Sequence, residues 1–281
     1  MTAYDEVIEE LRANDEQWRA FESTGHCVIL AGPGSGKTKL LTAKLARIVR
    51  EDIRPPRGVA CLTYNNECAR ELERRLEKLG VRPSANLFIG TLHAFCLRHV
   101  LGPLGAIAGL DVQLPVAGAS EHAQREALEA AMLAVGLNAQ GFETQLERFR
   151  RTEIDRRDGE GEWEMGDHGL TDVCLEYERI LHGQGRVDFQ GIILLALKAI
   201  EQSEAVRRCL LARFPVLFID EYQDLGVALD RMVKVLCFDG GVRLFAVGDP
   251  DQSIYGFTGS RPELLRTLAK RTDVARVKLR S

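Results

Sequence analysis

Eight consecutive residues near the N-terminus have the types and spacing that bind a phosphate chain. They run Ala31-Gly32-Pro33-Gly34-Ser35-Gly36-Lys37-Thr38, between the apolar run Cys27–Leu30 and a segment with apolar residues at helical spacing. Glycines let successive backbone N–H groups converge on phosphate oxygens, Lys37 can reach the β and γ phosphates, and the Thr38 hydroxyl can ligate Mg²⁺. The strict pattern has Gly where this chain has Ala31, but the position between strand and helix predicts a nucleoside triphosphate site.

Two adjacent acids follow a second apolar run. Asp220 and Glu221 come directly after Val216–Ile219. In a phosphate-loop enzyme the first such carboxylate holds Mg²⁺ and the second orients and deprotonates the attacking water. We therefore assign Asp220 to the metal and Glu221 to the base, with Lys37 as the other catalytic side chain. The alternative is a strand end that carries solvated acids.

A third segment, Gly248 to Phe257, follows the apolar run Leu244–Val247. Open parallel sheets bind ligands where their strands end, so Gln252 is placed to reach the γ-phosphate or its water. The aromatic side chains of Tyr255 and Phe257 either offer flat faces to bases or anchor the loop on the sheet. The residues alone leave both interpretations open.

Gln17 precedes the phosphate loop in the run Asn14-Asp15-Glu16-Gln17. A glutamine amide can contact N6 and N7 of adenine in a bidentate manner. The alternative is an ordinary polar residue of a helix.

These groups need a sheet to position them. Short apolar runs recur along the chain, and amphipathic helical segments separate most of them, which is typical of a parallel sheet covered on both faces. The expected strands are Val28–Leu30, Val59–Thr63, Leu87–Ile89, Val216–Ile219, Leu244–Val247 and Val274–Leu279. From about residue 97 to 186 the pattern becomes helical, at Glu121–Val135 and Phe142–Arg151, which predicts a helical insertion into an α/β domain.

The composition limits the class of protein and the partners that this chain can have. The chain has 281 residues, 45% hydrophobic and 28% charged, which is ordinary globular usage. The longest apolar run, Gly191–Ala196, is too short to cross a bilayer, so we expect no membrane partner. Seven scattered cysteines, never spaced as C-x-x-C, argue against disulfides and zinc and favour a reducing cytoplasm. Residues 93–188 hold 9 basic and 17 acidic side chains, so a nucleic-acid groove is expected on the flanking parts.

Taken together and in order, these segments resemble the first part of a UvrD/Rep-type superfamily 1 DNA helicase. The resemblance is carried by Asn14–Gln17, Ala31–Thr38, Leu62–Asn66 with Ala69–Arg75, Ile89–His93, Asp188–Phe189, Ile219–Leu225 and Val247–Gly259. It implies a RecA-like P-loop NTPase sheet with an inserted all-α subdomain. The expected domains are residues 1–96 and 188–281 for the two segments of the RecA-like domain and 97–187 for the insertion.

The resemblance also implies roles for individual residues. It implies ATP and Mg²⁺ as cofactors, with Thr38 and Asp220 on the metal and Gln252 as the γ-phosphate sensor. The nucleotide-contacting set is Gln17, Ala31, Gly32, Pro33, Gly34, Ser35, Gly36, Lys37, Thr38 and Lys39. The set that contacts single-stranded DNA is Thr63, Tyr64, Asn65, Thr91, His93, Tyr255 and Phe257. His93 as a helix cap and Tyr64 as a packed aromatic residue are the alternatives.

The functional expectation is the ATP-binding and single-stranded-DNA-binding N-terminal portion of an ATP-dependent DNA helicase or translocase. The second RecA-like domain and a sensor arginine are expected beyond Ser281, so we expect weak or no hydrolysis by this chain alone. The alternative is an ATP-binding regulatory or scaffold subunit of a nuclease or defence complex, with a protein partner on the acidic insertion. An RNA-directed enzyme or a small-molecule kinase is a more distant alternative.

Overall fold

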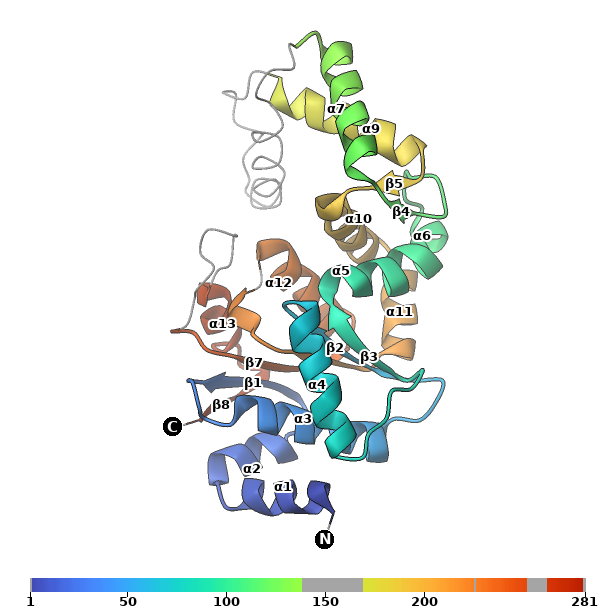
Figure 1. The fold of residues 1–281 in the computed structure, drawn as a ribbon. Coiled ribbons are helices and arrows are strands. Elements are labelled where there is room, and N and C mark those ends of the chain that lie inside the picture. The colour runs from blue at the N-terminus through green and yellow to red at the C-terminus, as the bar shows by residue number, and fades with distance from the viewer. Residues whose placement is uncertain (1, 138–168, 225, 252–261, 280–281) are drawn as a thin grey trace. The chain divides into compact units, whose positions relative to one another are not determined.

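The computed structural model describes residues 2–137, 169–224, 226–251 and 262–279. The chain divides into two compact units (Figure 1). Unit 1 comprises Met1–Phe95 and Arg207–Ser281, and unit 2 comprises Cys96–Val206. The chain thus returns to unit 1 at Arg207, whereas the sequence places the return at residue 188. The reason is helix α10 (Phe189–Gln202), which packs on the other helices of unit 2. The functional division into a RecA-like domain and an insertion stays a prediction.

Unit 1 is built on a six-stranded sheet in which every pairing is parallel. Its order is β3-β2-β6-β7-β1-β8, so β7 separates β1 from β6. The strands are β1 (His26–Ala31), β2 (Val59–Thr63), β3 (Leu87–Thr91), β6 (Val216–Ile219), β7 (Arg243–Gly248) and β8 (Val274–Leu279). All six lie where the sequence predicts strands, and the predicted α/β class with a parallel sheet is confirmed.

Helices cover both faces of this sheet. In Figure 1, α1 to α4 lie on one side, and α5, α12 and α13 lie on the other. The first group is α1 (Ala3–Arg12), α2 (Asp15–Glu22), α3 (Lys37–Arg47) with the π-helical turn η1 (Ile48–Asp52), and α4 (Asn66–Lys78). The second group is α5 (Leu92–Phe95), the 3₁₀ turn η3 (Tyr222–Asp224), α12 (Val227–Lys234) with the π-helical turn η4 (Val235–Asp239), and α13 (Pro262–Leu268). α11 (Glu204–Arg213) precedes β6.

Local chemistry sets where these helices begin. The Asn14 side chain accepts a hydrogen bond from the Gln17 N–H at 2.9 Å, and the Asn65 side chain accepts one from the Cys68 N–H at 2.8 Å. Both are N-cap bonds, which satisfy a backbone donor that the first turn of a helix leaves unpaired. Gly36 precedes α3 in the left-handed conformation, which costs glycine least.

The core of unit 1 forms because helices cover both faces of its sheet. Every residue of β2 and β6 is buried, as expected for strands with helices on both faces. Phe218 of β6 and Phe245 of β7 pack with their ring centroids 5.1 Å apart. Leu40, Leu41 and Leu45 of α3 complete the same apolar cluster. The core therefore lies between α3 and the centre of the sheet.

The described part of unit 2 is mainly helical. Its elements are the π-helical turn η2 (Cys96–Leu101), α6 (Gly102–Ala108), α7 (Glu121–Val135), α9 (Leu170–Gly183), α10 and two short parallel strands, β4 (Ala117–Gly118) and β5 (Arg186–Val187). The α7 helix has the predicted limits. The predicted helix at 142–151 lies outside the described residues. α7 and α9 pack through an apolar cluster that includes Met132 and Tyr177. Across the described ranges of both units, no helix is long and apolar enough to cross a membrane.

We expect Phe218→Ala to lower the free energy of unfolding by about 3–5 kcal/mol, because it leaves a cavity at a fully buried position of the central sheet. Urea unfolding of the whole chain measures the effect. Arg276→Ala, at an exposed position on the edge strand β8, is the control and should change the value by no more than about 0.5 kcal/mol. Equal effects of the two substitutions would contradict the packing described above.

Candidate nucleotide site

The loop between β1 and α3 has the backbone geometry of an anion cradle. Gly34 and Gly36 have φ values of +73° and +82°, which residues with a Cβ rarely adopt. The Ser35 hydroxyl donates to the Gly32 carbonyl at 2.7 Å and closes the turn. α3 begins at Lys37, so the unpaired N–H groups of its first turn face the loop. Ala31 is buried at the end of β1, where its methyl group belongs to the core rather than to the loop.

The acidic end of β6 lies close to this loop, across one intervening strand. Lys37 Nζ is 2.7 Å from both Oε1 and Oε2 of Glu221. Neighbouring strands are about 4.8 Å apart, so β1 and β6 are separated by about 10 Å, which a lysine and a glutamate side chain together can bridge. The two predicted groups, 184 residues apart in sequence, therefore lie together.

A glutamine that the sequence analysis did not single out holds Glu221 in place. Gln223 Nε2 donates to Glu221 Oε2 at 2.9 Å, and its Oε1 accepts the Asp249 N–H at 3.0 Å. Gly248 at the end of β7 makes this possible, because a Cβ there would come within 2.6 Å of Gln223 Oε1. Gln223 lies within Ile219–Leu225, one of the segments that carry the family resemblance, and that position was the signal that could have identified it.

Glu221 itself has a strained backbone. Its φ is +53°, the one positive φ among the described non-glycine residues. Such a conformation costs on the order of 1 kcal/mol or more and persists only where surrounding contacts determine it. The next residue supplies one such contact: Tyr222 is fully buried and its hydroxyl donates to Asp230 Oδ1 at 2.7 Å. Asp230 belongs to α12, so this bond attaches the turn to that helix, and within α12 Asp230 also pairs with Lys234 at 2.6 Å.

Asp220 is a buried carboxylate beside a like charge. One of its oxygens accepts the Glu221 N–H at 3.2 Å. Burial, and after it the charge of Glu221, raises the pKa of Asp220 to about 6, while Lys37 opposes the shift. The pKa of Asp224 is also raised to about 6, chiefly by burial and then by Glu221. Three carboxylates thus compete for one lysine.

The oxygen atoms of Asp220 and Thr38 are of the type that binds Mg²⁺. The cation prefers oxygen ligands and is usually held by one or two carboxylates plus substrate phosphates and water. Asp220 supplies a carboxylate and Thr38, in the first turn of α3, a hydroxyl. A cation beside Asp220 would also offset its repulsion by Glu221. Within the described ranges no group of three or more His, Cys, Asp or Glu side chains forms a ready cation cage.

Gln17 lies against the phosphate loop. Its Nε2 donates to the Ser35 carbonyl at 2.9 Å, and a Cβ on Gly36 would come within 2.8 Å of the same nitrogen. The predicted base-contacting residue and the loop are therefore in direct contact. The Lys39 side chain passes beside the same loop, since a Cβ on Gly36 would come within 3.8 Å of its Cε, and its ammonium pairs with Glu10 of α1 at 3.0 Å.

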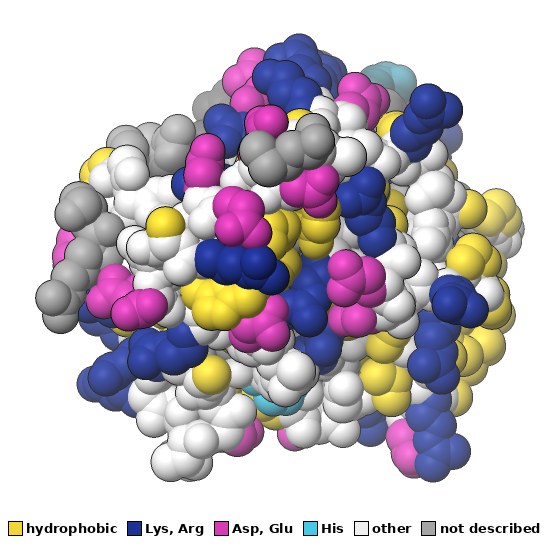
Figure 2. All heavy atoms as spheres, turned by 90° about the horizontal axis from the view of Figure 1, so that it is seen from below, with side chains coloured by type: hydrophobic (Ala, Val, Ile, Leu, Met, Phe, Trp, Pro, Cys, Tyr) yellow, Lys and Arg dark blue, Asp and Glu magenta, His cyan; other side chains and the backbone are white. Residues whose placement is uncertain are grey.

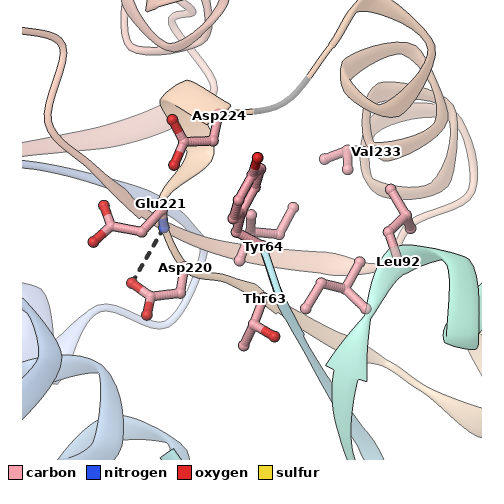
Figure 3. A pocket seen from close by; sticks show the side chains of 9 residues that line it. Thr63, Tyr64, Leu92, Asp220, Glu221, Asp224 and Val233 are labelled. Carbon is pink, nitrogen blue, oxygen red and sulfur yellow. Dashed lines mark hydrogen bonds between the residues drawn. The ribbon is translucent and has the colours of Figure 1, made fainter. Parts of the chain in front are cut away.

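The predicted DNA-contacting residues fall on two neighbouring strand ends. Thr63 ends β2 and Tyr64 follows it, and both line one pocket together with Asp220, Glu221 and Asp224. In Figure 3, Tyr64 lies between these acids and the apolar side chains of Leu92 and Val233. Tyr64 is 40% exposed, so its ring is accessible.

The other predicted DNA contacts have structural tasks as well. The Asn65 side chain caps α4, and the Thr91 hydroxyl accepts the Ala94 N–H at 3.3 Å. Burial lowers the pKa of His93 to about 4, so its imidazole is neutral at pH 7. A neutral His93 offers hydrogen bonds but no charge to a phosphate. Gln252, Tyr255 and Phe257 lie outside the described residues.

Comparison with known proteins decides the family. The model of the UvrD/REP helicase N-terminal domain matches residues 13–273. The chain belongs to this family. It is 28% identical over 272 residues to the ATP-dependent DNA helicase Rep of Escherichia coli, an alignment that covers 92% of this chain and 39% of Rep. It is 27% identical over 256 residues to the ATP-dependent DNA helicase PcrA of Staphylococcus aureus, which covers 88% of this chain and 34% of PcrA.

The helicase Rep of Salmonella typhimurium is similar at 29% identity over 270 residues, with 92% of this chain and 39% of that protein covered. The chain thus spans little more than a third of the length of these relatives. The resemblance inferred from the motifs is confirmed, and so is the RecA-like type of fold that it implied.

The buried carboxylate of Asp220 should make stability depend on pH. Folding raises the pKa of Asp220 from 3.8 to about 6, so the folded chain binds more protons than the unfolded chain between these values, and stability falls as the pH rises through them. We expect Asp220→Asn to raise the free energy of unfolding by on the order of 3 kcal/mol at pH 7.5 and by about a third of that at pH 4.5, where only part of the interval between the two pKa values has been crossed. Urea unfolding without magnesium measures both values.

Asp273→Asn is the matched control. Its exposed carboxylate bonds Arg271, which lowers the pKa of Asp273, so this substitution should not stabilise the chain at pH 7.5. If Asp220→Asn left the unfolding free energy at pH 7.5 unchanged, the description of Asp220 as a buried, penalised charge would be wrong.

Proposed function

We propose that this chain is the ATP-binding portion of an ATP-dependent DNA helicase or translocase, and that it contacts single-stranded DNA. The supporting observation is the approach of Lys37 to Glu221 across β7, beside a loop whose backbone can bind phosphate. The relatives named above are described as ATP-dependent DNA helicases. That activity is carried to this chain as a proposal, since the chain spans a limited part of each relative.

In the proposed binding step the triphosphate takes the place of Glu221 on Lys37. The N–H groups of the loop and of the first turn of α3 receive the phosphate oxygens, and the ammonium of Lys37 moves from the carboxylate to the β and γ phosphates. Lys39 stands beside the same turn and would add a second positive charge near the nucleotide. ATP binding thus frees the carboxylate that hydrolysis needs.

Glu221 then acts as the base. Gln223 and the strained backbone keep its carboxylate at the end of β6, where it can accept a proton from a water that attacks the γ-phosphate. Asp220 and the Thr38 hydroxyl would hold Mg²⁺, which neutralises charge on the phosphate oxygens when it is bound. Gln252 is proposed as the γ-phosphate sensor on the strength of the family motif.

The base is proposed to be adenine, read by Gln17. The Gln17 amide nitrogen carries two hydrogens, and one of them is used on the Ser35 carbonyl. The other can bond N7 while the amide oxygen accepts from N6, which is the bidentate pattern for adenine.

Single-stranded DNA is proposed to cross the ends of β2 and β3. Thr63, Tyr64, Asn65, Thr91 and His93 gather there, and the accessible ring of Tyr64 supports stacking on a base. Tyr255 and Phe257 are proposed to extend this surface by family resemblance. None of the seven cysteines, all of which lie among the described residues, forms a disulfide, which supports the proposed cytoplasmic location. A protein partner on the acidic insertion stays a prediction, and no observation favours the scaffold alternative over the helicase.

We expect Lys37→Met to weaken binding of Mg·ATP by at least about tenfold, because it removes charge-assisted hydrogen bonds to phosphate. Glu221→Gln should strengthen it several-fold, because Lys37 then loses a competing carboxylate. Isothermal titration calorimetry on the whole chain measures both constants. Lys270→Met, at an exposed position after α13, is the control and should leave the constant unchanged. A parent chain that does not bind Mg·ATP would overturn the proposal.

For DNA, we expect Tyr64→Ala to weaken binding of a thymidine oligonucleotide by about 1–3 kcal/mol through lost stacking. The dependence of affinity on salt should stay the same, since no charge is removed. Fluorescence anisotropy over a salt series measures both. Tyr64→Phe retains the ring and should retain the affinity. Tight nucleotide binding without DNA binding at low salt would instead support the scaffold alternative.

A further inference from the structure

Lys44 is a buried cation that the site described above does not use. It lies in α3, seven residues after Lys37, and is 5% exposed. Its ammonium donates to the carbonyl oxygens of Phe21 and Ser23, the latter at 2.7 Å. It also lies 5.7 Å from the centre of the Phe21 ring. Every one of these partners belongs to the C-terminal end of α2.

The end of α2 needs such donors. The last carbonyl groups of a helix have no partner within the helix and carry a partial negative charge. The Ser23 hydroxyl satisfies the Ala20 carbonyl at 2.7 Å, and Lys44 satisfies the Phe21 and Ser23 carbonyls. Without the ammonium, the buried Phe21 carbonyl and the partly buried Ser23 carbonyl would lose this partner, which is unfavourable because a buried acceptor without a hydrogen bond is costly.

The other end of α2 carries Gln17. The N-cap bond of Asn14 sets the first turn of the helix, and Gln17 Nε2 then reaches the Ser35 carbonyl of the phosphate loop. α2 is therefore attached at both ends to one continuous segment, the loop and α3. One attachment is the Gln17–Ser35 bond. The other, at the C-terminal end, is the pair of bonds from Lys44 to the carbonyls, beside the ion pair of Arg47 with the Glu22 side chain. An eight-residue helix is about 12 Å long and stiff, so a shift at one end moves the other.

We propose that Lys44 is a positioning residue for recognition of the nucleotide base. By holding the C-terminal end of α2 on α3, it fixes where the Gln17 amide stands relative to the phosphate loop and so sets the preference for adenine. The inference rests on the proposed ATP site and adds to it a residue that contacts neither base nor phosphate.

The burial of Lys44 supports a specific task. Burial, and after it the charges of Arg47 and Arg243, lowers the pKa of Lys44 to about 8, while Glu22 and Asp52 act in the opposite direction. A buried ammonium is costly, and an apolar side chain would fill the space at lower cost. The two directed hydrogen bonds are what a lysine provides here and a methionine does not.

The test compares three ligands on the whole chain: Mg·ATP, Mg·GTP and magnesium tripolyphosphate, which has no base. We expect Lys44→Met to reduce the ratio of ATP to tripolyphosphate affinity, and of ATP to GTP affinity, by about five- to tenfold. Tripolyphosphate affinity itself should stay unchanged, because the loop and Lys37 are intact. Lys44→Arg, which keeps donors for both carbonyls, should retain the ratios.

Arg47→Met is the matched control. It removes the same charge from the end of the same helix. Arg47 also contacts the end of α2, but through the Glu22 side chain and the Phe21 ring rather than through the backbone carbonyls, so this substitution tests whether the carbonyl bonds themselves matter. Acidic and basic side chains are interspersed on the face seen in Figure 2, and such exposed pairs contribute little. The Arg47→Met chain should keep the parent's preference for ATP.

The outcomes separate this inference from the proposed function. A parent chain that binds neither ATP nor tripolyphosphate would overturn the proposed function. A parent that binds ATP, GTP and tripolyphosphate equally would overturn the inference alone, as would an equal loss of ATP and tripolyphosphate affinity in Lys44→Met. Equal effects of Lys44→Met and Arg47→Met would also overturn it. If Lys44→Met does not fold, Lys44→Gln, which keeps an amide donor, is measured with the same ligands and the same criteria.

Discussion

The ion pair between Lys37 and Glu221 depends on the order of three parallel strands. The lysine begins the helix after β1, the glutamate follows β6, and β7 lies between them. Because parallel strands end at the same edge of a sheet, both side chains leave from that edge and meet above the end of β7. Gly248 leaves the space through which Gln223 joins them. A side chain at position 248, at the end of β7, would collide with Gln223 and prevent it from bonding Glu221.

This edge of the sheet concentrates features that are unfavourable for folding. Asp220 and Asp224 are carboxylates with raised pKa values, and Glu221 has a positive φ. Natural proteins tolerate such features where function requires them, because the rest of the fold supplies the stability. Here that stability comes from the continuous apolar cluster between α3 and the sheet.

Several parts of this arrangement could be inferred from local patterns. The runs Val59–Thr63 and Val216–Ile219 are strands because a strand covered on both faces has no polar side and reads as an unbroken apolar segment. The glycines at 34 and 36 identify the loop, since few other residues tolerate its backbone conformation. The helix at Glu121–Val135 has the limits expected from its Ser120 cap and the Gly136 that follows. In each case the information is contained within a few consecutive residues.

The amino-acid sequence by itself determined the strands, the phosphate-binding loop, the acidic strand end and, through the order of its motifs, the helicase family. Only the tertiary structure decided which groups meet: Lys37 with Glu221, Gln223 with the Asp249 backbone, and Lys44 with the end of α2. It also decided that Asn65 and Thr91 bond the first turns of the helices that follow them. The physical reason is that hydrophobic periodicity reports how each segment is buried, whereas the order of strands in the sheet determines which distant side chains share an edge.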